Sequence, residues 1–392
     1  MQSEEGSYNA HRYLLTRVLQ NYSKDIRPVS KHMDPIEVFI NVMPKALINY
    51  DEINGVLHMS FALELSWIDE ILNWDPSLNH NISFLRIPAT QVWTPRLFCL
   101  NAIDNIAMDK ATSENVLYDY KGSAIYLMGL QSSTLCPPNS MYFPFDIQVC
   151  YIDVISSLSF YEETFIANAV IYDVFEQNPL WDLLNIRISV VRNEQGQLLI
   201  FRIMVKLQRR HAFFMVTIFS PIVFLAIVNL FVFMIPVDSG ERVSYAITVL
   251  LSFTVFLSLV TANTPKSSLT VSLFSVYMFM VLLYSFLITL SVVVILDIYF
   301  TNKDQAPKWN LSKMVVWGLK KERSKVQRSV ITVLPKTDDT EYAEKTTKTD
   351  DPHDVDYKTI SSALDKFFIR FYSLLFTLIT VTFMTVIALD DK

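Results

Sequence analysis

The sequence predicts a multidomain membrane protein in which an all-β sandwich is followed by a bundle of four transmembrane helices. The placement of charge and the periodicity of apolar residues carry this prediction. Of the 392 residues 51% are hydrophobic, and the chain still holds 33 basic and 39 acidic side chains. Charges and short strand-like runs fill residues 1–210, whereas residues 212–300 and 367–389 are almost free of charge. We therefore expect a soluble half joined to a membrane half.

The soluble half begins with a helical pattern and continues with strand patterns. Apolar residues between positions 9 and 22 recur at the spacing of a short amphipathic helix. From about residue 35, nearly alternating runs separated by turn-forming residues predict strands, as in residues 37–42, 56–65 and 201–207. Many short strands of this kind are typical of a β-sandwich. Residues 1–210 are therefore predicted to form a sandwich domain with an N-terminal helix.

The second half contains four apolar stretches. They are Ala212–Ile235, Val243–Ala262, Leu269–Ile298 and about Phe371–Leu389. Each approaches or exceeds the roughly 20 residues that a helix needs to cross a bilayer. We expect the first three membrane helices within residues 211–300, and the fourth helix with the C-terminus within residues 367–392.

The distribution of basic residues predicts the orientation in the membrane. Lysine and arginine outnumber acidic residues in residues 303–328, and basic loops are retained on the cytoplasmic side. Residues 301–366 are therefore expected to form a cytoplasmic loop with an amphipathic helix, and both termini to be extracellular, in a multi-pass protein of the plasma membrane. Asn21 and Asn81 begin triplets that match glycosylation acceptors, which suits an extracellular domain.

The composition excludes several classes of function. The net charge of -6 and the lack of a dense basic face argue against nucleic-acid binding. The 6 histidines are scattered, and the chain has neither a glycine-rich phosphate loop nor metal-ligand spacing. We therefore expect no enzyme, no cofactor and no metal site.

One cysteine pair carries a specific motif. Cys136 and Cys150 enclose residues 137–149, which contain Phe143-Pro144-Phe145-Asp146 and, two residues before Cys150, Gln148. A cysteine pair alone indicates no more than a structural disulfide. The complete segment resembles the Cys-loop of the pentameric ligand-gated ion channels. Further segments resemble motifs of the same family: Trp93-Thr94-Pro95, Trp181-Asp182-Leu183, residues 236–242 and residues 307–309.

The sequence is thus identified as a member of the Cys-loop receptor family, most similar to acetylcholine-receptor-like cationic subunits of an invertebrate orphan type. The resemblance implies a disulfide between Cys136 and Cys150. It also implies assembly with other subunits in a pentamer; we expect a homomeric one, and the sequence leaves heteromeric assembly open.

The second apolar stretch has the pattern of a pore-lining helix. Six of its residues, three of which bear hydroxyl groups, recur every three to four positions and share one helix face: Ser244, Thr248, Leu251, Val255, Ser258 and Ala262. Five such faces around an axis would line a water-filled pore. The alternative is that the hydroxyl groups only bond the preceding turn or a neighbouring helix.

Two positions on or beside this face predict gating and selectivity. A ring of Leu251 side chains at mid-span would form a hydrophobic gate that closes by dewetting. Glu241 at the cytoplasmic mouth would repeat five times and attract monovalent cations. Anion-selective relatives usually insert a proline before this position, whereas Gly240 directly precedes Glu241 here. The alternative for Glu241 is a solvated loop charge.

The resemblance also suggests residues that couple ligand binding to the pore. These are Glu52 after the first long strand, Arg209 before the first membrane helix, Phe143, Pro144 and Asp146 in the Cys-loop, and Pro265 after the pore helix. A buried pair of arginine and carboxylate would be a strong coupling element. The alternative is a screened surface pair. A second proline expected in acetylcholine-type subunits is Ser272 here.

The ligand site departs from the family pattern. Receptors for quaternary amines surround the cation with aromatic rings. Alignment to the motifs places Leu100, Ala62 and either Ser157 or Leu158 where aromatic residues are expected. The cleft would instead be lined by apolar residues, two charged residues and two further aromatic candidates: Ala62, Leu100, Leu117, Ile125, Leu127, Arg192, Glu194, Tyr172 and Phe175.

We therefore expect a small apolar or amphipathic extracellular ligand, with an anionic group for Arg192, and no response to acetylcholine. Three alternatives remain open at this stage. The cleft is vestigial, the channel is gated by another stimulus, or the chain is a non-conducting accessory subunit.

Overall fold

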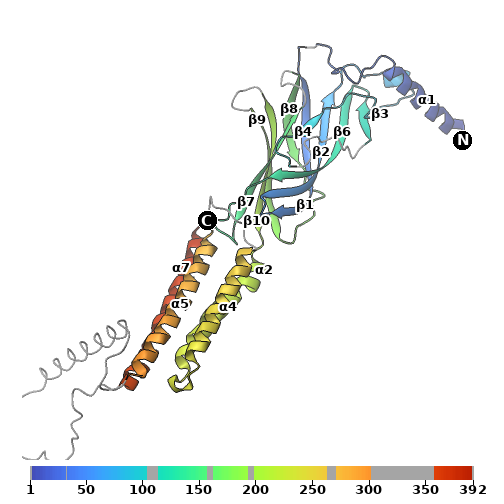
Figure 1. Cartoon of the computed structure of the whole chain (residues 1–392). Helices are drawn as coiled ribbons and strands as arrows, with labels where there is room; N and C mark the ends of the chain where they lie inside the picture. Colours follow the sequence, from blue (N-terminus) through green and yellow to red (C-terminus); the bar gives the residue numbers. More distant parts are fainter. Residues whose placement is uncertain are drawn as a thin grey trace, which may run out of the picture. The chain divides into compact units, whose positions relative to one another are not determined.

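A computed structural model describes residues 2–31, 33–103, 114–156, 162–192, 198–262, 271–301 and 357–390. The described residues form two units, a β domain that ends at His211 and a helical domain that begins at Ala212 (Figure 1). The predicted sequence of an all-β sandwich followed by four apolar helices is confirmed.

The β domain consists of an N-terminal helix and two sheets. Its elements are α1 (Gln2–Leu19), β1 (Ile36–Asp51), β2 (Val56–Ile68), η1 (Pro76–Leu78), β3 (Phe84–Pro88), β4 (Leu97–Cys99), β5 (Asn115–Asp119), β6 (Ser123–Leu135), β7 (Ile147–Ser156), β8 (Glu163–Val170), β9 (Trp181–Arg192) and β10 (Leu199–Arg209). One sheet has the order β3-β5-β6-β2-β1-β8, and the other has the order β4-β7-β10-β9. Neighbouring strands are antiparallel except for β1 and β8, which are parallel.

Alternating burial explains why these segments form a sandwich. Along β2, the side chains of Leu57, Met59, Leu63 and Leu65 are at most 2% exposed, and most of the residues between them are half-buried. Alternate residues of a strand point to opposite faces of its sheet, so this pattern places one apolar row in the core. Trp67 continues this row. Its ring packs edge to face against the ring of Trp93, which lies between β3 and β4 in the chain.

The helical domain contains four segments that are long and apolar enough to cross a membrane. Its elements are α2 (Ala212–Phe214), the π-helical turn η2 (Met215–Phe219), α3 (Ser220–Leu230), η3 (Phe231–Met234), η4 (Val237–Ser239), α4 (Arg242–Ala262), α5 (Leu273–Tyr299) and α7 (Tyr357–Asp390). The elements from α2 to η3 form the first span, and α4, α5 and α7 form the others. The predicted amphipathic helix of the cytoplasmic loop lies outside the described residues.

Two helices begin earlier than the apolar pattern predicts. α1 begins at Gln2 rather than near residue 9. α7 begins at Tyr357, well before the apolar stretch at Phe371. The early turns of α7 are polar in sequence but packed, because Leu364 and Ser361 are 6% and 1% exposed. Hydropathy alone therefore misses them.

Aromatic and polar contacts hold the helices together. α7 lies alongside α5 (Figure 1), and the Tyr277 and Phe383 rings stack with their centroids 4.5 Å apart. Asn229 of α3 donates a hydrogen bond to Ser285 of α5 at 3.0 Å, and both residues are fully buried. Such contacts replace the hydrophobic driving force that is missing between helices in lipid.

Candidate functional site

The stripe predicted to line a pore lies on the face of α4 that the rest of the subunit does not cover. Leu251 is 60% exposed and Val255 is 54% exposed, and the other stripe residues with described side chains are exposed as well: Ser244, Thr248 and Ser258. The opposite face is buried within the subunit through Ala246, Val249, Phe253 and Val260. These positions lie about half a turn from the stripe at ~100° per residue. Ala262 ends the helix, and its side chain is outside the described set.

The hydroxyl groups of α4 donate their hydrogen bonds to the helix itself. Thr248 donates to the carbonyl of Ser244 at 2.8 Å, and Ser258 donates to the carbonyl of Thr254 at 3.0 Å. The alternative named for these hydroxyl groups, hydrogen bonding to the preceding turn of the helix, is therefore also observed. A hydroxyl whose hydrogen is used in this way still has oxygen lone pairs. On an exposed face these oxygens are available as acceptors, which suits a passing cation better than an anion.

Glu241 lies at the start of the same helix and is exposed. Its carbonyl accepts the first helical hydrogen bond from Tyr245 at 2.9 Å. Gly240 has a φ of 73°, in the left-handed region that favours glycine, and this turn directs the chain into α4. Among the described residues, the Glu241 carboxylate forms no ion pair. A free carboxylate at a helix N-terminus is stabilised by the helix dipole and remains open to solvent.

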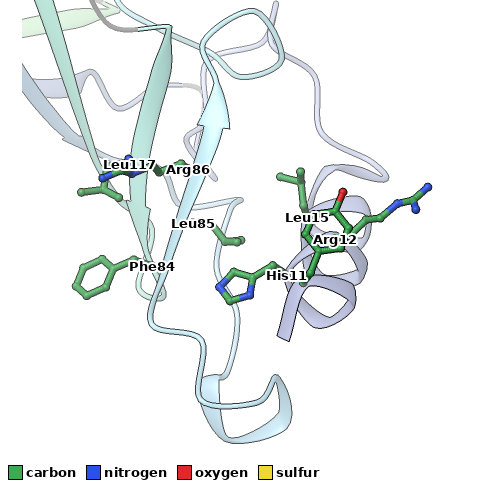
Figure 2. A pocket seen from close by; sticks show the side chains of 8 residues that line it. His11, Arg12, Leu15, Phe84, Leu85, Arg86 and Leu117 are labelled. Atoms are coloured by element: carbon green, nitrogen blue, oxygen red, sulfur yellow. The ribbon is translucent and has the colours of Figure 1, made fainter. Parts of the chain in front are cut away.

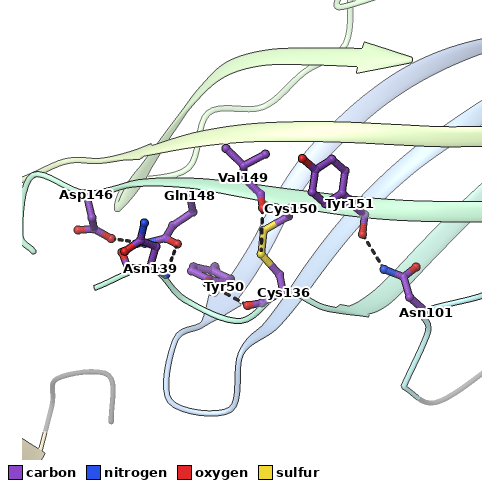
Figure 3. Close-up of a disulfide and its surroundings, with 9 residues drawn as sticks. All are labelled: Tyr50, Asn101, Cys136, Asn139, Asp146, Gln148, Val149, Cys150 and Tyr151. Atoms are coloured by element: carbon purple, nitrogen blue, oxygen red, sulfur yellow. Dashed lines mark hydrogen bonds between the residues drawn. A yellow bond between two sulfur atoms is a disulfide. The ribbon is translucent and has the colours of Figure 1, made fainter. Parts of the chain in front are cut away.

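The Cys-loop is closed by the predicted disulfide between Cys136 and Cys150, whose Cα atoms are 5.2 Å apart (Figure 3). Gln148 ties the loop to itself: its amide oxygen accepts from the Asn139 N–H, and its amide nitrogen donates to the Asn139 carbonyl, both at 2.9 Å. The same nitrogen donates to Asp146 at 2.5 Å. The glutamine is 2% exposed, and its hydrogen bond restricts the orientation of the Asp146 carboxylate.

The turn between β1 and β2 is fastened to the same loop. The Cys136 N–H donates to the Gly55 carbonyl at 2.7 Å, and the Tyr50 hydroxyl donates to the Cys136 carbonyl at 3.1 Å. Gly55 has a φ of 66°, and a Cβ atom there would lie 3.3 Å from the Cys136 carbonyl oxygen. Glycine is therefore needed both for the turn and for the close approach of the loop.

Arg209, the last residue of β10, joins these two segments through a cluster of buried charge. Its guanidinium donates to Asp146 at 2.7 and 3.0 Å and to Glu52 at 2.7 and 2.6 Å. The side chains of Arg209, Asp146 and Glu52 are 13%, 3% and 18% exposed. The screened surface pair is thus excluded as a description of Arg209.

Two aromatic rings and the carboxylates fix the charge of Arg209. Its guanidinium carbon lies 4.7 Å from the Phe143 ring centre and 4.4 Å from the Trp181 ring centre. Burial lowers the pKa of Arg209, but the hydrogen bonds of Asp146 and Glu52 outweigh burial, and the pKa lies above its usual value. The cluster keeps one negative charge in excess, because two carboxylates share one guanidinium. The sequence did not predict that the rings of Phe143 and Trp181 pack against Arg209, although Trp181 belongs to a recognised motif.

Of the two remaining coupling candidates, Pro144 and Pro265, only Pro144 lies within the described residues. Pro144 is buried and follows Phe143 through a cis peptide bond. Pro265 lies outside the described residues.

The predicted cleft residues lie in two groups on different sheets. Leu117, Ile125 and Leu127 belong together on β5 and β6, where Leu117 pairs with Ile125. Leu100 follows β4 and is 48% exposed, and Arg192 ends β9 and is exposed. The predicted cleft residues are therefore divided between the two sheets of the sandwich.

Several cleft predictions are corrected or lie beyond the described chain. Ala62 is only 2% exposed, so its methyl group is not available to a ligand in this subunit. Tyr172 uses its hydroxyl to accept the Ile186 N–H at 2.9 Å, and Phe175 packs against the core. Phe175 therefore contributes to the packing of the domain, whereas the Tyr172 side chain is 44% exposed and its part in a ligand site stays a prediction. Ser157, Leu158 and Glu194 lie outside the described residues. Asn21 and Asn81 are exposed, as glycosylation acceptors need to be, and their glycosylation remains a prediction.

A cavity of about 700 Å³ separates α1 from β3 (Figure 2). Its lining includes His11 and Leu15 of α1, Phe84 and Leu85 of β3, and the predicted cleft residue Leu117. Figure 2 shows His11 directed from α1 toward Leu85, whereas the Arg12 guanidinium extends away from the strand. The basic groups thus do not converge on one point.

Comparison with known proteins agrees with this architecture. A family model described as the neurotransmitter-gated ion-channel ligand binding domain matches residues 11–210, and one described as the neurotransmitter-gated ion-channel transmembrane region matches residues 218–330. The chain is 32% identical over 290 residues to the 5-hydroxytryptamine receptor 3A of Cavia porcellus, which covers 70% of this chain and 58% of that protein.

Two further relatives are subunits of acetylcholine receptors. The beta-type subunit unc-29 of Caenorhabditis elegans is 28% identical over 333 residues, which are 81% of this chain and 66% of that protein. The neuronal subunit alpha-6 of Homo sapiens is 28% identical over 318 residues, which are 76% of this chain and 62% of that protein. The matched part of the chain thus spans from 58% to 66% of the length of these three relatives.

Proposed function

Because the chain belongs to the neurotransmitter-gated ion-channel family, we propose that it is a subunit of a pentameric ligand-gated ion channel that conducts cations across the plasma membrane. The β domain and both termini are extracellular in this proposal, and residues 301–366 are cytoplasmic. The family membership rests on matches to both the binding domain and the membrane region.

The uncovered stripe of α4 is the observation that supports conduction. A helix embedded in lipid gains nothing from exposed hydroxyl groups, whereas a helix beside water does. The stripe lies opposite the residues of α4 that are buried within the subunit, such as Ala246 and Phe253. A non-conducting accessory subunit has no need of such a face.

Leu251 is the proposed gate. The wetting of a narrow pore depends on how apolar its walls are, so a ring of exposed leucine side chains at mid-helix favours a dry, closed state. Leu251→Thr should therefore produce current without ligand when the full chain is expressed alone in oocytes. Leu250→Thr is the matched control, because Leu250 is half-buried beside the stripe. Equal leak currents in the two variants would contradict the gate.

Glu241 is the proposed selectivity ring. Its carboxylate is exposed and forms no ion pair among the described residues, so five copies would attract cations and repel anions. In Glu241→Ala the reversal potential should move away from the cation equilibrium potential when external NaCl is diluted. Asp238→Ala removes an acid from the same linker and serves as the control. An unchanged reversal potential in Glu241→Ala would exclude this role.

The Arg209 cluster is the proposed route from ligand to pore. It joins the β1–β2 turn and the Cys-loop to the end of β10, and only two residues separate Arg209 from α2 in the chain. A shift of either carboxylate therefore acts on the residue that leads into the first membrane helix.

The ligand of this channel is proposed to be a small amphipathic molecule with an anionic group. Leu100, Ile125 and Leu127 offer exposed apolar surface, and the exposed Arg192 offers a cation. A panel of aromatic and aliphatic carboxylates, applied to the homomeric channel beside acetylcholine and serotonin, tests this. We expect a carboxylate to open the channel and Arg192→Ala to weaken its effect. Current evoked by acetylcholine at wild-type Arg192 would contradict the proposal.

A further inference from the structure

Arg242, the first residue of α4, is fixed by a residue far away in the sequence. Two of its nitrogens donate to the two carboxylate oxygens of Asp365 on α7, at 2.8 and 2.9 Å. Its Nε donates to the Ile235 carbonyl, at the end of the first span, at 2.5 Å. The side chains of Arg242 and Asp365 are 4% and 13% exposed. The guanidinium is thus buried, and one carboxylate neutralises it.

Aromatic packing sets the position of the acid. Phe233 of η3 stacks on Phe368 and on Tyr372 of α7, with 5.9 Å between ring centroids in both contacts. Phe368 lies three residues after Asp365, so the two share a helix face. Because Leu364 beside them is also buried, Asp365 is held by a packed helix and not by a mobile surface turn.

The neutralisation of Arg242 matters because Glu241 directly precedes it. A guanidinium keeps its proton at any physiological pH. Glu241 and an unpaired Arg242 would therefore sum to no charge at this end of α4. Because Asp365 is bound to Arg242, the net charge of this ion pair inside the bundle is zero. The exposed Glu241 then provides the net negative charge at this end of α4.

Two further charged side chains lie beside Tyr299, near this linker. Asp238 accepts a hydrogen bond from the Tyr299 hydroxyl at 2.8 Å, and the Lys358 ammonium lies 5.2 Å from the centre of the same Tyr299 ring. One acid and one base thus flank one tyrosine. Neither changes the sum that Glu241, Arg242 and Asp365 set.

We propose that Asp365 is a specificity-determining residue of the pore, because its ion pair with the buried Arg242 leaves Glu241 as the net charge at this mouth. The inference rests on the proposed channel function. Asp365 acts through Arg242 and does not itself meet the ion, so it is a positioning residue. Repeated five times, the arrangement converts a mixed ring of acids and bases into an acidic ring.

A charge cycle on the full-length channel tests the proposal. Reversal potentials under NaCl dilution are recorded in a Leu251→Thr background, which supplies open pores without an agonist. Asp365→Asn should lower the permeability of sodium relative to chloride by about tenfold, which corresponds to about 1.4 kcal/mol. Arg242→Gln with Asp365→Asn should return the ratio to that of the parent, since Glu241 is again the net charge. Asp34→Asn, which removes an exposed acid of the β domain, should leave the ratio unchanged.

Two results would overturn the inference: an unaltered ratio in Asp365→Asn, or an equal loss in the single and the double variant. If Asp365→Asn does not reach the cell surface, thermal unfolding of the purified pentamers decides. The double variant must then melt close to the parent and well above the single variant, because it buries no unpaired charge. A silent or anion-selective parent would instead contradict the proposed function, and the thermal cycle would still test the pair.

Discussion

The β domain and the helical domain each bury an arginine, and they satisfy it differently. Arg209 in the β domain is shared by two carboxylates and lies between two aromatic rings. Arg242 in the helical domain has one carboxylate and one carbonyl. The first cluster carries an excess negative charge, and the second sums to zero.

The difference follows from the solvent that each domain meets. An uncompensated charge in a membrane bundle is costly, so a one-to-one pair is expected there. In the β domain the acid that is not needed for neutrality can still meet water, because the Glu52 side chain is 18% exposed. A cluster with two acids for one arginine can exchange one acid and keep the other, which suits an element that changes state. The one-to-one pair of Arg242 and Asp365 has no second acid to exchange, so it suits an element that stays fixed. Four predictions test this contrast, beginning with the largest effect.

Arg209→Gln should lower the free energy of unfolding by about 3–5 kcal/mol, because it leaves two buried carboxylates without their partner. Arg210→Gln is the matched control. Arg210 pairs with Asp182 on the surface, where the side chains are 36% and 50% exposed, so its loss should change stability by about 1 kcal/mol or less. Thermal unfolding and surface expression of the full chain measure both variants. Equal losses would remove the distinction between the buried cluster and a surface pair.

Glu163 is a buried acid of the β domain that forms no ion pair among the described residues. It is 2% exposed; its Oε2 accepts a hydrogen bond from Ser156, and its Oε1 has no hydrogen-bond partner among the described residues. Burial, helped by Glu162 and opposed by Ser156 and Arg27, raises the pKa of Glu163 from 4.5 to about 7. The folded state therefore binds this proton more tightly than the unfolded state does.

Stability from Glu163 should be fully present below pH 4.5 and should be lost as the pH rises to about 7. The loss should approach about 3 kcal/mol. Glu163→Gln should remove this dependence and be more stable than the wild type above pH 7. Unfolding at a series of pH values measures the difference between the two proteins. Parallel pH profiles would show that Glu163 is ionised in the folded domain at neutral pH.

Tyr22 is a neutral hydrogen-bond donor to a buried acid, and its removal tests how much such a hydrogen bond stabilises the β domain. Its hydroxyl donates to Asp69 at 2.7 Å, and Asp69 is fully buried. Burial raises the pKa of Asp69, and the hydrogen bonds from Tyr22 and from the backbone at Leu72 and Ile71 oppose it. Tyr22→Phe should cost about 1.5–3 kcal/mol at neutral pH, as for a hydrogen bond to a charged group. Tyr13→Phe, at a side chain that is 69% exposed, should be silent in the same unfolding measurement.

Ser285→Ala should have the smallest effect. It removes the acceptor of the buried Asn229 amide between α3 and α5. Hydrogen bonds between membrane helices contribute about 0.6 kcal/mol on average. Thermal unfolding of the purified channel measures the loss of stability. A loss of that size would show that this neutral hydrogen bond stabilises the bundle much less than the ion pair of Arg242 does. A loss equal to that of Asp365→Asn would erase this ranking. Ser220→Ala, at an exposed position, is the control.

The sequence by itself determined the features that depend on local period and composition. Strands alternate with a period of two and helices repeat every three to four residues, so the sandwich, the four spans and the stripe with Leu251 and Val255 could be predicted from residues close together in the chain. The Cys-loop was recognisable for the same reason, since Phe143, Asp146 and Gln148 all lie between its two cysteines.

Only the tertiary structure decided which charges are buried together. Arg242 and Asp365 are 123 positions apart, and Arg209 and Glu52 are 157 apart. The resemblance pointed to Arg209 and Glu52 but left open whether they are buried, and nothing local distinguishes Asp365 from other acids of the chain. Their burial and partners follow from how strands and helices pack. An ion pair is defined by the distance between two atoms in space and by the solvent that packing excludes, and neither quantity is a property of a short stretch of sequence.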